Sequence, residues 1–273
     1  MQQADSVSKG KRVIVKFGTG ILTRTDGVAL DLNQFERLTG ELAAARAAGH
    51  EVILVSSGAI ATGMADLGMS ERPTELPMLQ ACASIGQSRL MELYRTLFAK
   101  HGLLVGQLLL TSQDLDSRIR YTNARNTLNA LLKLRRVIPI INENDSVATD
   151  EVPRFADNDV LSAEVAILSG ADELIILSGI NGLTESPDGI GPAIPLVENI
   201  AEVEKYVGPV KGRLSRGGMV SKLSSVGKAV EHGIRATIAN GRTPGMIAGA
   251  LNGELIGTTF LPDRKAAQVI PPL

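Results

Sequence analysis

A lysine followed by two closely spaced glycines stands near the start of the chain, in Lys16-Phe-Gly-Thr-Gly20. Glycines let the backbone bend tightly and bring its N–H groups to an anion, and the lysine adds a compact positive charge. This combination is typical of phosphate binding. In a Walker A loop, however, the lysine follows the glycines, and no Gly-x-x-x-x-Gly-Lys-Ser/Thr occurs in the chain. Taken alone, the segment is equally compatible with an ordinary glycine-rich turn after a strand.

A second element that combines glycines with a lysine lies in the segment Arg213–Lys222. Gly217 and Gly218 lead into a predicted helix, and Lys222 falls in its first turn or shortly after. The segment is either a turn before an exposed helix, with Lys222 on the solvated face, or a flexible phosphate loop whose lysine returns to an active site.

Two polar clusters, Asn142–Asp145 and Asp157–Asp159, are candidates for substrate recognition. They could recognise a polar substrate, an ammonium group above all, or orient lysines through charge-assisted hydrogen bonds. They could also be a solvated loop, with Asp157 and Asn158 capping a helix that begins near Val160. Ligation of Mg²⁺ by the carboxylates is a third possibility, although no spacing here specifies it.

The segment Ser56-Ser57-Gly58-Ala59 opens a predicted helix. Hydroxyl and free N–H groups at a helix start suit a phosphate or carboxylate, but serine more commonly caps the helix itself. The three histidines (His50, His101 and His232) lie at predicted helix ends, where a cation suits the helix dipole, and we expect them to be structural.

The elements that must position these residues alternate along the chain. Strand-like runs of Val, Ile and Leu occupy 12–17, 51–56, 103–110, 137–141 and 173–177, with a weaker run at 235–238. The segments between them have helical spacing of apolar residues. Such alternation predicts an α/β fold, a three-layer αβα sandwich around an open and mainly parallel sheet. Ligands of such sheets bind beyond the carboxyl ends of the strands. Four segments follow predicted strands and are expected to lie there: 16–20, 56–59, 142–145 and 178–179.

Composition narrows the class of protein. The 273 residues are 44% hydrophobic and 3% aromatic, and 28 basic residues nearly balance 29 acidic ones. This argues against a nucleic-acid partner. The one cysteine, Cys82, excludes an internal disulfide and sits among apolar residues, so we expect a buried structural thiol and a reducing compartment. Polar residues at the N-terminus and short apolar runs predict no secretory signal, no membrane partner and a cytoplasmic location.

Taken in order, these pieces resemble the amino acid kinase family. The resemblance covers nearly everything from Lys11 to about Pro262 and implies the fold of that family. The motifs that carry it span 15–20, 55–63, 85–90, 123–128, 141–148, 157–159 and 216–222.

The resemblance implies ATP-dependent phosphorylation of the γ-carboxylate of L-glutamate, the first step of proline biosynthesis. Lys16 and Lys222 would hold the phosphates with Mg²⁺, Asp159 would orient both lysines, and no protein metal ligand is assigned. Implied glutamate-binding residues are Ser57, Asp145, Asn158 and Asp157. Implied ATP-binding residues are Lys16, Gly18, Ser178, Gly179, Arg216, Gly217, Gly218, Met219, Val220, Ser221 and Lys222, with the amides of Gly18 and Gly58 facing the phosphoryl group.

The chain departs from the family pattern at two places. Ser178-Gly179 stands where Thr-Asp or Ser-Asp is usual, so a carboxylate expected near the nucleotide is missing. Bacterial members often carry a further C-terminal module, the PUA domain, and we expect this chain to lack it. Other acidic acceptors, or a catalytically weak regulatory paralogue, remain alternatives. A dinucleotide-binding oxidoreductase does not, because no Gly-x-Gly-x-x-Gly follows the first strand.

The resemblance also predicts organisation and partners. We expect one kinase domain over 11–262, with an acceptor-binding lobe over about 11–170 and a nucleotide-binding lobe over about 171–262. Family members form homodimers or homotetramers and are inhibited by proline, and we expect Ser112–Arg125 to respond to proline.

Overall fold

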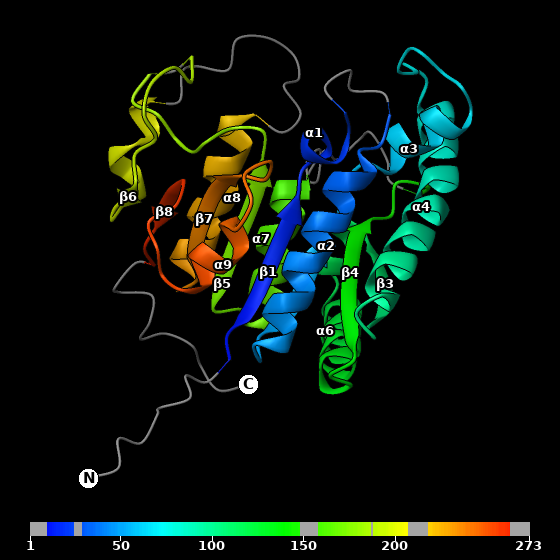
Figure 1. Ribbon diagram of the computed structural model, residues 1–273, viewed down its shortest axis with the longest axis horizontal. Helices are drawn as coiled ribbons and strands as arrows, with labels where there is room; N and C mark the ends of the chain where they lie inside the picture. The colour runs from blue at the N-terminus through cyan, green and yellow to red at the C-terminus, as the bar shows by residue number, and fades with distance from the viewer. Residues whose placement is uncertain (1–9, 25–28, 148–157, 187, 207–217, 263–273) are drawn as a thin grey trace.

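The computed structural model places a single eight-stranded sheet between two layers of helices (Figure 1). It describes residues 10–24, 29–147, 158–186, 188–206 and 218–262. The strands are β1 (Arg12–Phe17), β2 (Glu51–Val55), β3 (Leu104–Leu110), β4 (Val137–Glu143), β5 (Glu173–Ser178), β6 (Leu196–Val197), β7 (Arg235–Asn240) and β8 (Thr258–Phe260). Their order across the sheet is β3-β4-β2-β1-β5-β7-β8-β6.

The sheet is mainly parallel, as the uninterrupted apolar runs predict. β1 pairs in parallel with β2 and with β5, and only the β7–β8 pair is antiparallel within the described strands. All six expected strands are present, and five of them differ from the prediction by one or two residues at an end. β4 continues through Asn142 and Glu143, so the first two residues of the Asn142–Asp145 cluster belong to the sheet. The short strands β6 and β8 were not predicted.

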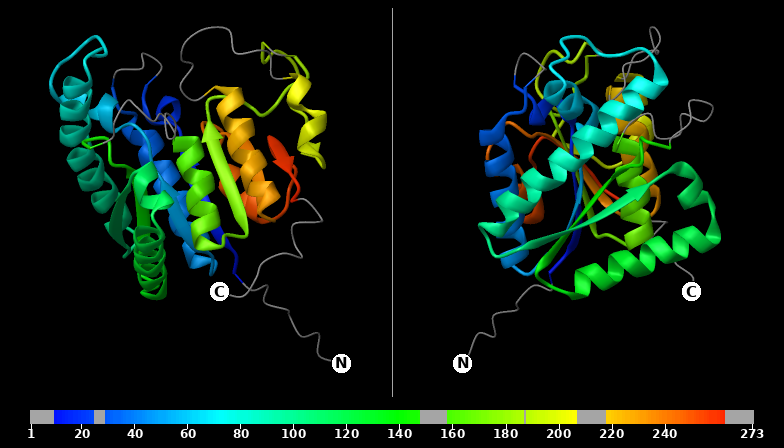
Figure 2. Two further views of the ribbon diagram at one scale, coloured as in Figure 1. Left: turned by 180° about the vertical axis from the view of Figure 1, so that it is seen from behind. Right: turned by 90° about the vertical axis from the view of Figure 1, so that its right-hand side faces the viewer.

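Helices cover both faces of the sheet. They are α1 (Thr19–Leu22), α2 (Leu32–Ala47), α3 (Ala59–Asp66), α4 (Leu76–Ala99), α5 (Ser112–Asp116), α6 (Arg118–Lys133), α7 (Asn158–Ser169), α8 (Met219–Glu231) and α9 (Met246–Leu251), with 3₁₀ turns at Ile200–Glu202 and Glu204–Tyr206. α6, α7 and α8 pack against one face, and α1, α2, α3, α4 and α9 against the other (Figure 2). In β1, Ile14 faces the first layer while Val13 and Val15 face the second, because successive side chains alternate. The αβα sandwich is confirmed.

Two glycines bring α3 and α4 into contact. A Cβ at Gly86 would lie 1.9 Å from the carbonyl oxygen of Ala59, and one at Gly63 would lie 1.9 Å from that of Cys82. Only glycine permits so close an approach of the two backbones. Cys82 is fully buried at this contact, as expected of a structural thiol. The contact fixes the start of α3, just after Ser57, against the middle of α4.

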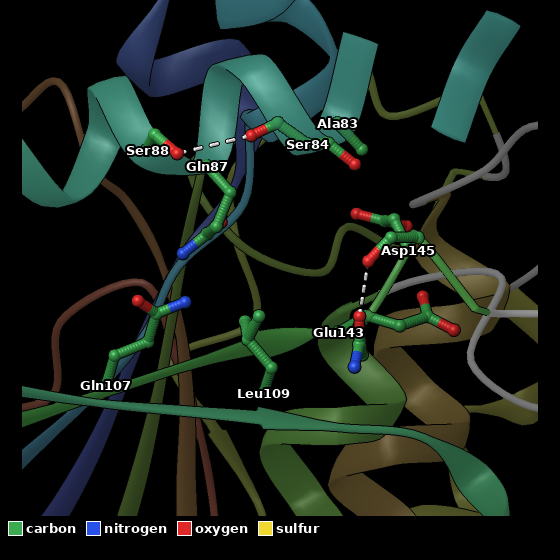
Figure 3. Close-up of a pocket in the computed structure, with 10 residues that line it drawn as sticks. Ala83, Ser84, Gln87, Ser88, Gln107, Leu109, Glu143 and Asp145 are labelled. Carbon is green, nitrogen blue, oxygen red and sulfur yellow. Dashed lines mark hydrogen bonds between the residues drawn. The ribbon is translucent and has the colours of Figure 1, made fainter. Parts of the chain in front are cut away.

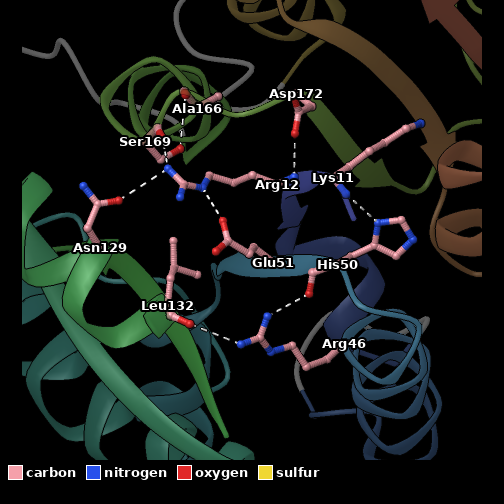
Figure 4. Close-up of polar contacts among 10 residues, drawn as sticks. All are labelled: Lys11, Arg12, Arg46, His50, Glu51, Asn129, Leu132, Ala166, Ser169 and Asp172. Atoms are coloured by element: carbon pink, nitrogen blue, oxygen red, sulfur yellow. Dashed lines mark hydrogen bonds and ion pairs between the residues drawn. The ribbon is translucent and has the colours of Figure 1, made fainter. Parts of the chain in front are cut away.

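A polar network ties the amino ends of the strands together, at the edge opposite the candidate residues (Figure 4). The backbone N–H of Arg12 donates to Asp172 at 2.7 Å, and its guanidinium donates to Glu51 at 2.8 Å. The N–H of Lys11 donates to Nδ1 of His50 at 3.1 Å. These contacts join β1 to β2 and β5, and they give His50 a hydrogen bond within this network.

No helix in the described segments is both long and apolar enough to cross a lipid bilayer.

Candidate active site

Two lysines share one aspartate at the carboxyl edge of the sheet. Lys16 lies near the end of β1, Asp159 in the first turn of α7 and Lys222 in the first turn of α8. One carboxylate oxygen of Asp159 forms an ion pair with Lys16, and the other accepts from Nζ of Lys222 at 3.0 Å. Elements separated by long stretches of sequence thus deliver three charges to one point, as the expectation that Asp159 orients both lysines requires.

The three charged residues of the cluster are buried. Lys16, Asp159 and Lys222 are 3%, 0% and 5% exposed. Placing Lys222 on a solvated helix face is therefore wrong, and so is a solvated loop for Asp159. Burial of charge is costly unless the charge is paired, and the carboxylate of Asp159 pairs with both ammonium groups. The arrangement favours a bound anion beside the lysines, which is what a transferred phosphoryl group provides.

Asn158 connects this charged cluster to the Ser56–Gly58 turn. Its side-chain amide donates to Oγ of Ser57 and to Oδ1 of Asn142, each at 3.1 Å. Asn142 in turn donates to Oε1 of Gln87 on α4 at 2.8 Å. Within the described structure, Oδ1 of Asn158 is buried and has no hydrogen-bond partner, so it can accept from a ligand.

The serine turn does not cap α3 through a hydroxyl. The N-cap residue is Gly58, and no side chain caps the helix. Ser57 instead meets Asn158, while Oγ of Ser56 lies 2.8 Å from the hydroxyl of Tyr94. Burial raises the pKa of Tyr94 well above its usual range, so this phenol is a neutral partner. Helix capping as the reason for these serines is therefore wrong, and Ser57 lies in the network expected for the acceptor.

A cavity of about 230 Å³ opens beside this network (Figure 3). Its lining comes from α4, from β3 and from the end of β4 with the residues that follow it. It includes Gln87, Gln107, Glu143, Asn144 and Asp145. Asp145 therefore lines a cavity beside the network of Ser57, Asn158 and Asn142. Gln87 was not singled out, although it stands within a motif that carries the resemblance, and Glu143 was named only as part of the Asn142–Asp145 cluster.

The amide of Gly18 does not point toward a phosphoryl group, contrary to expectation. It donates to the carbonyl of Leu177 at 3.0 Å and so extends the pairing of β1 with β5. Gly18 still lies beside the cluster, because a Cβ at this position would be 3.7 Å from Nζ of Lys16. Because Gly18 has no side chain, the space next to the ammonium group stays open.

Ser178 and Gly179, expected on the nucleotide side, end β5 at the same edge. Ser178 is buried, and in the described part of the chain its Oγ has no hydrogen-bond partner. A Cβ at Gly179 would meet nothing within 4 Å. Asn240, which pairs with Ser178 in the sheet, donates from its side-chain amide to Oδ1 of Asn181 at 2.8 Å.

The second glycine–lysine element is described only from Gly218 onward. Gly218 is the N-cap residue of α8, and Met219, Val220 and Ser221 form its first turn before Lys222. Asp157, Arg216 and Gly217, also expected at the site, lie outside the described residues.

A metal cage of protein side chains does not occur in the described segments, where no three or more His, Cys, Asp or Glu residues converge. Mg²⁺ commonly keeps its waters and is held by substrate phosphates with one or two carboxylates. Mg²⁺ bound in this way fits this edge of the sheet, because a phosphate between the lysines would supply oxygen ligands to the metal.

Comparison with known proteins shows which family the chain matches. Residues 11–240 match the amino acid kinase family. The chain is 45% identical over 260 residues to a glutamate 5-kinase of Pelobacter propionicus, covering 93% of this chain and 68% of that protein. It is 44% identical over 264 residues to a glutamate 5-kinase of Geobacter sulfurreducens, covering 95% and 70%.

Solved structures share the fold at low sequence identity. The UMP kinase of Bacillus anthracis superposes with a TM-score of 0.61 at 16% identity, over 93% of this chain and 96% of that one. The N-acetylglutamate synthase of Neisseria gonorrhoeae, in complex with coenzyme A and L-arginine, gives 0.62 at 12% identity, over 93% and 62%. The match of residues 11–240 to the family and the identity to the two glutamate 5-kinases lead to one conclusion: the chain belongs to the amino acid kinase family.

Proposed function

We propose that this chain is a glutamate 5-kinase, which transfers the γ-phosphoryl group of ATP to the γ-carboxylate of L-glutamate as the first step of proline biosynthesis. The observation that carries the proposal is the Lys16–Asp159–Lys222 cluster, joined through Asn158 to a polar cavity. Relatives at 43–45% identity that bear this name support it.

The chemistry needs no general base. A carboxylate is ionised at neutral pH, so one of its oxygens attacks the γ-phosphorus directly while the bond to the bridging oxygen breaks and ADP leaves. No proton is transferred in this step. The difficulty is the repulsion between two anions, which Lys16 and Lys222 reduce by electrostatic stabilisation as charge develops.

Mg²⁺ supplies further neutralisation of the β- and γ-phosphates when it is bound with ATP. Asp159 is occupied by the two lysines, so we assign it to orienting them and expect the phosphates to provide most of the metal ligands.

The acceptor and the nucleotide are assigned to opposite sides of the cluster. Ser57, Asn158 and Asp145 would hold glutamate, with the carboxylate of Asp145 meeting the ammonium group, and Asp157 is proposed beside them. Ser178, Gly179 and the residues from Arg216 to Lys222 would hold ATP. In this division the acceptor lobe spans about 11–170 and the nucleotide lobe about 171–262.

A coupled assay of ADP release against a panel of acceptors tests the function. We expect turnover with L-glutamate, trapped as the hydroxamate, and little with L-aspartate or N-acetyl-L-glutamate. Turnover with another acceptor alone would reassign the substrate. ATP binding by calorimetry without phosphoryl transfer would favour a regulatory paralogue, which the absence of a carboxylate at Gly179 motivates.

Feedback and assembly extend the proposal. We propose that proline competes with glutamate and that Ser112–Arg125 responds to it, because this segment follows β3, whose Gln107 and Leu109 line the cavity.

A homodimer or homotetramer is supported by exposed apolar side chains on the β3–α6 side. Leu104 and Ile119 are 59% and 74% exposed. Light scattering after gel filtration, with and without proline, tests the oligomeric state and its response to proline. We place the enzyme in the cytoplasm, where ATP and glutamate are available.

A further inference from the structure

We propose that Arg242, in the turn after β7, is a positioning residue that holds α1 and, through it, keeps Gly18 beside the ammonium group of Lys16. The effect on catalysis rests on the kinase function proposed above, whereas the mechanical part does not. Arg242 lies outside every motif that carries the family resemblance.

Arg242 donates hydrogen bonds to the carboxyl end of α1. One terminal nitrogen of its guanidinium donates to the carbonyls of Gly20 and Thr23, each at 2.8 Å. A cation at the carboxyl end of a helix satisfies carbonyls that have no partner within the helix and interacts favourably with its dipole. This matters most for a helix of 4 residues, which propensity alone does not stabilise in water.

The residue before Arg242 holds α1 by packing. A Cβ at Gly241 would lie 2.4 Å from Cδ1 of Ile21, so this side chain of α1 sits directly on the glycine. Gly241 is itself fixed, because its N–H donates to the carbonyl of Ser178 at 2.8 Å and its carbonyl accepts from the amide of Gln34 at 2.6 Å. The β7 turn is thus anchored to β5 and α2, and it presents both a packing surface and a cation to α1.

A displacement of α1 would change the geometry around Lys16 in the charged cluster. Gly18 is the N-cap residue of α1, and its carbonyl accepts from the N–H of Ile21 at 3.2 Å. A Cβ at Gly18 would lie 3.7 Å from Nζ of Lys16, so the glycine borders the space in which an anion must sit. Misplacement by about 1 Å near a reacting centre can lower a rate roughly 100-fold. The contacts of Arg242 therefore bear on the transition state more than on acceptor binding.

The experiment compares Arg242→Ala with Arg37→Ala and Arg242→Lys. Arg37 is a matched control, because it donates to the carbonyl of the adjacent Gly241 but, among the described residues, forms no hydrogen bond with α1. We expect Arg242→Ala to lower kcat roughly 10- to 100-fold with the glutamate KM within twofold. Arg37→Ala should keep kcat within twofold, and Arg242→Lys should recover most of the loss, because a lysine also donates to carbonyls.

Hydrogen exchange gives a readout that needs no turnover. The N–H groups of Ile21 and Thr23 donate to the carbonyls of Gly18 and Thr19. We expect both amides to exchange at least tenfold faster in Arg242→Ala and to be unchanged in Arg37→Ala. Unchanged exchange in Arg242→Ala would overturn the inference. So would faster exchange with kcat unchanged in an active enzyme.

Failure of the two proposals can be told apart. An unsubstituted chain without glutamate-dependent turnover would contradict the kinase function, while the exchange data would still decide whether Arg242 holds α1. Equal losses of kcat in Arg242→Ala and Arg37→Ala would point to a general effect of the turn and contradict the specific role of Arg242.

Discussion

Oδ2 of Asp159 lies 3.0 Å from Nζ of Lys222, although the aspartate side chain is fully buried and that of the lysine is 6% exposed. The residues are 63 positions apart, on the first turns of two helices that pack side by side on one face of the sheet. Because the same carboxylate also pairs with Lys16, removal of any one of the three charges changes the balance felt by the other two.

Asp159→Asn should destabilise the protein and reduce catalysis together. The substitution leaves two buried ammonium groups without their shared counter-ion, and breaking a buried pair costs about 3–5 kcal/mol. We expect thermal unfolding to shift down and Mg²⁺–ATP to restore more stability to the variant than to the unsubstituted protein, because the phosphates replace the missing charge. Asp172→Asn, at the opposite edge of the sheet, is the control. If Mg²⁺–ATP raised the unfolding temperature of Asp159→Asn and of the unsubstituted protein equally, this electrostatic account would be contradicted.

Lys222→Ala should lower kcat far more than it raises the glutamate KM. The ammonium group acts mainly as charge develops in the transition state, and loss of one such donor costs roughly 100- to 1000-fold in rate. Steady-state kinetics measure the two constants. Lys228→Ala provides a control on the same helix, because Lys228 pairs with Glu164 away from the cluster and its side chain is 42% exposed. An unchanged kcat with a raised KM would reassign Lys222 to ground-state binding.

Asp145→Ala should chiefly raise the glutamate KM. Its carboxylate lines the cavity that we assign to the acceptor, where it would meet the substrate ammonium group. Removing one charged partner from a recognition site costs about 2–5 kcal/mol when the pair is buried, and less here because Asp145 remains partly exposed. Ser88→Ala at the same cavity, which removes only a neutral hydroxyl, should change KM little. An unchanged KM in Asp145→Ala would remove this residue from the acceptor site.

Six of the eight strands and the mainly parallel sheet were predictable, because uninterrupted apolar runs are typical of strands covered on both faces. The carboxyl-end rule then placed Lys16, Ser57 and Asn142 at one edge before any contact was known. The burial of Lys222 was not predictable. A lysine in the first turn of a helix can face solvent or core, and only the packing of α8 against α7 turns it toward Asp159.

Sequence reasoning also missed residues whose role depends on a contact between distant segments. Gln87 meets Asn142 across 55 positions, and Arg242 meets Gly20 across 222. Neither has a distinctive local pattern, since a glutamine on a helix and an arginine in a turn are common on any surface. The amide of Gly18 was assigned to the ligand for the opposite reason, because a glycine motif suggests free N–H groups and gives no sign that Leu177 takes one of them.

Gly86→Ala should destabilise the protein through the contact of α3 with α4. The added Cβ would lie 1.9 Å from the carbonyl oxygen of Ala59, so the helices must separate, and overpacking typically costs about 1–3 kcal/mol. Gly40→Ala is the matched control, because a Cβ there meets nothing within 4 Å in the middle of α2. This control should gain roughly 0.5–1 kcal/mol from helix propensity. Urea unfolding of both variants measures the difference, and a loss in Gly40→Ala equal to that in Gly86→Ala would contradict the steric explanation.

The start of α5 should make a pH-dependent contribution to stability through Asp114. Its carboxylate accepts from the N–H and the hydroxyl of Thr111, each at 2.7 Å, and from Arg120 at 3.2 Å. Burial opposes ionisation, but the bonds from Thr111 and then Arg120 outweigh it and lower the pKa of Asp114 below its ordinary value.

Because the folded-state pKa of Asp114 is lowered, its contribution is complete above the unfolded value of about 4 and is lost as pH falls through the folded value. Asp114→Asn should therefore lower the free energy of unfolding at pH 7 by about 1 kcal/mol, a typical effect of losing a helix cap. We expect this difference from the unsubstituted protein to shrink as the pH falls below about 4. Urea unfolding at a series of pH values measures it, with Glu92→Gln, from an exposed pair with Arg89, as a control expected near zero. A difference that stayed constant down to pH 3 would show that the ionised carboxylate of Asp114 is not what stabilises the start of α5.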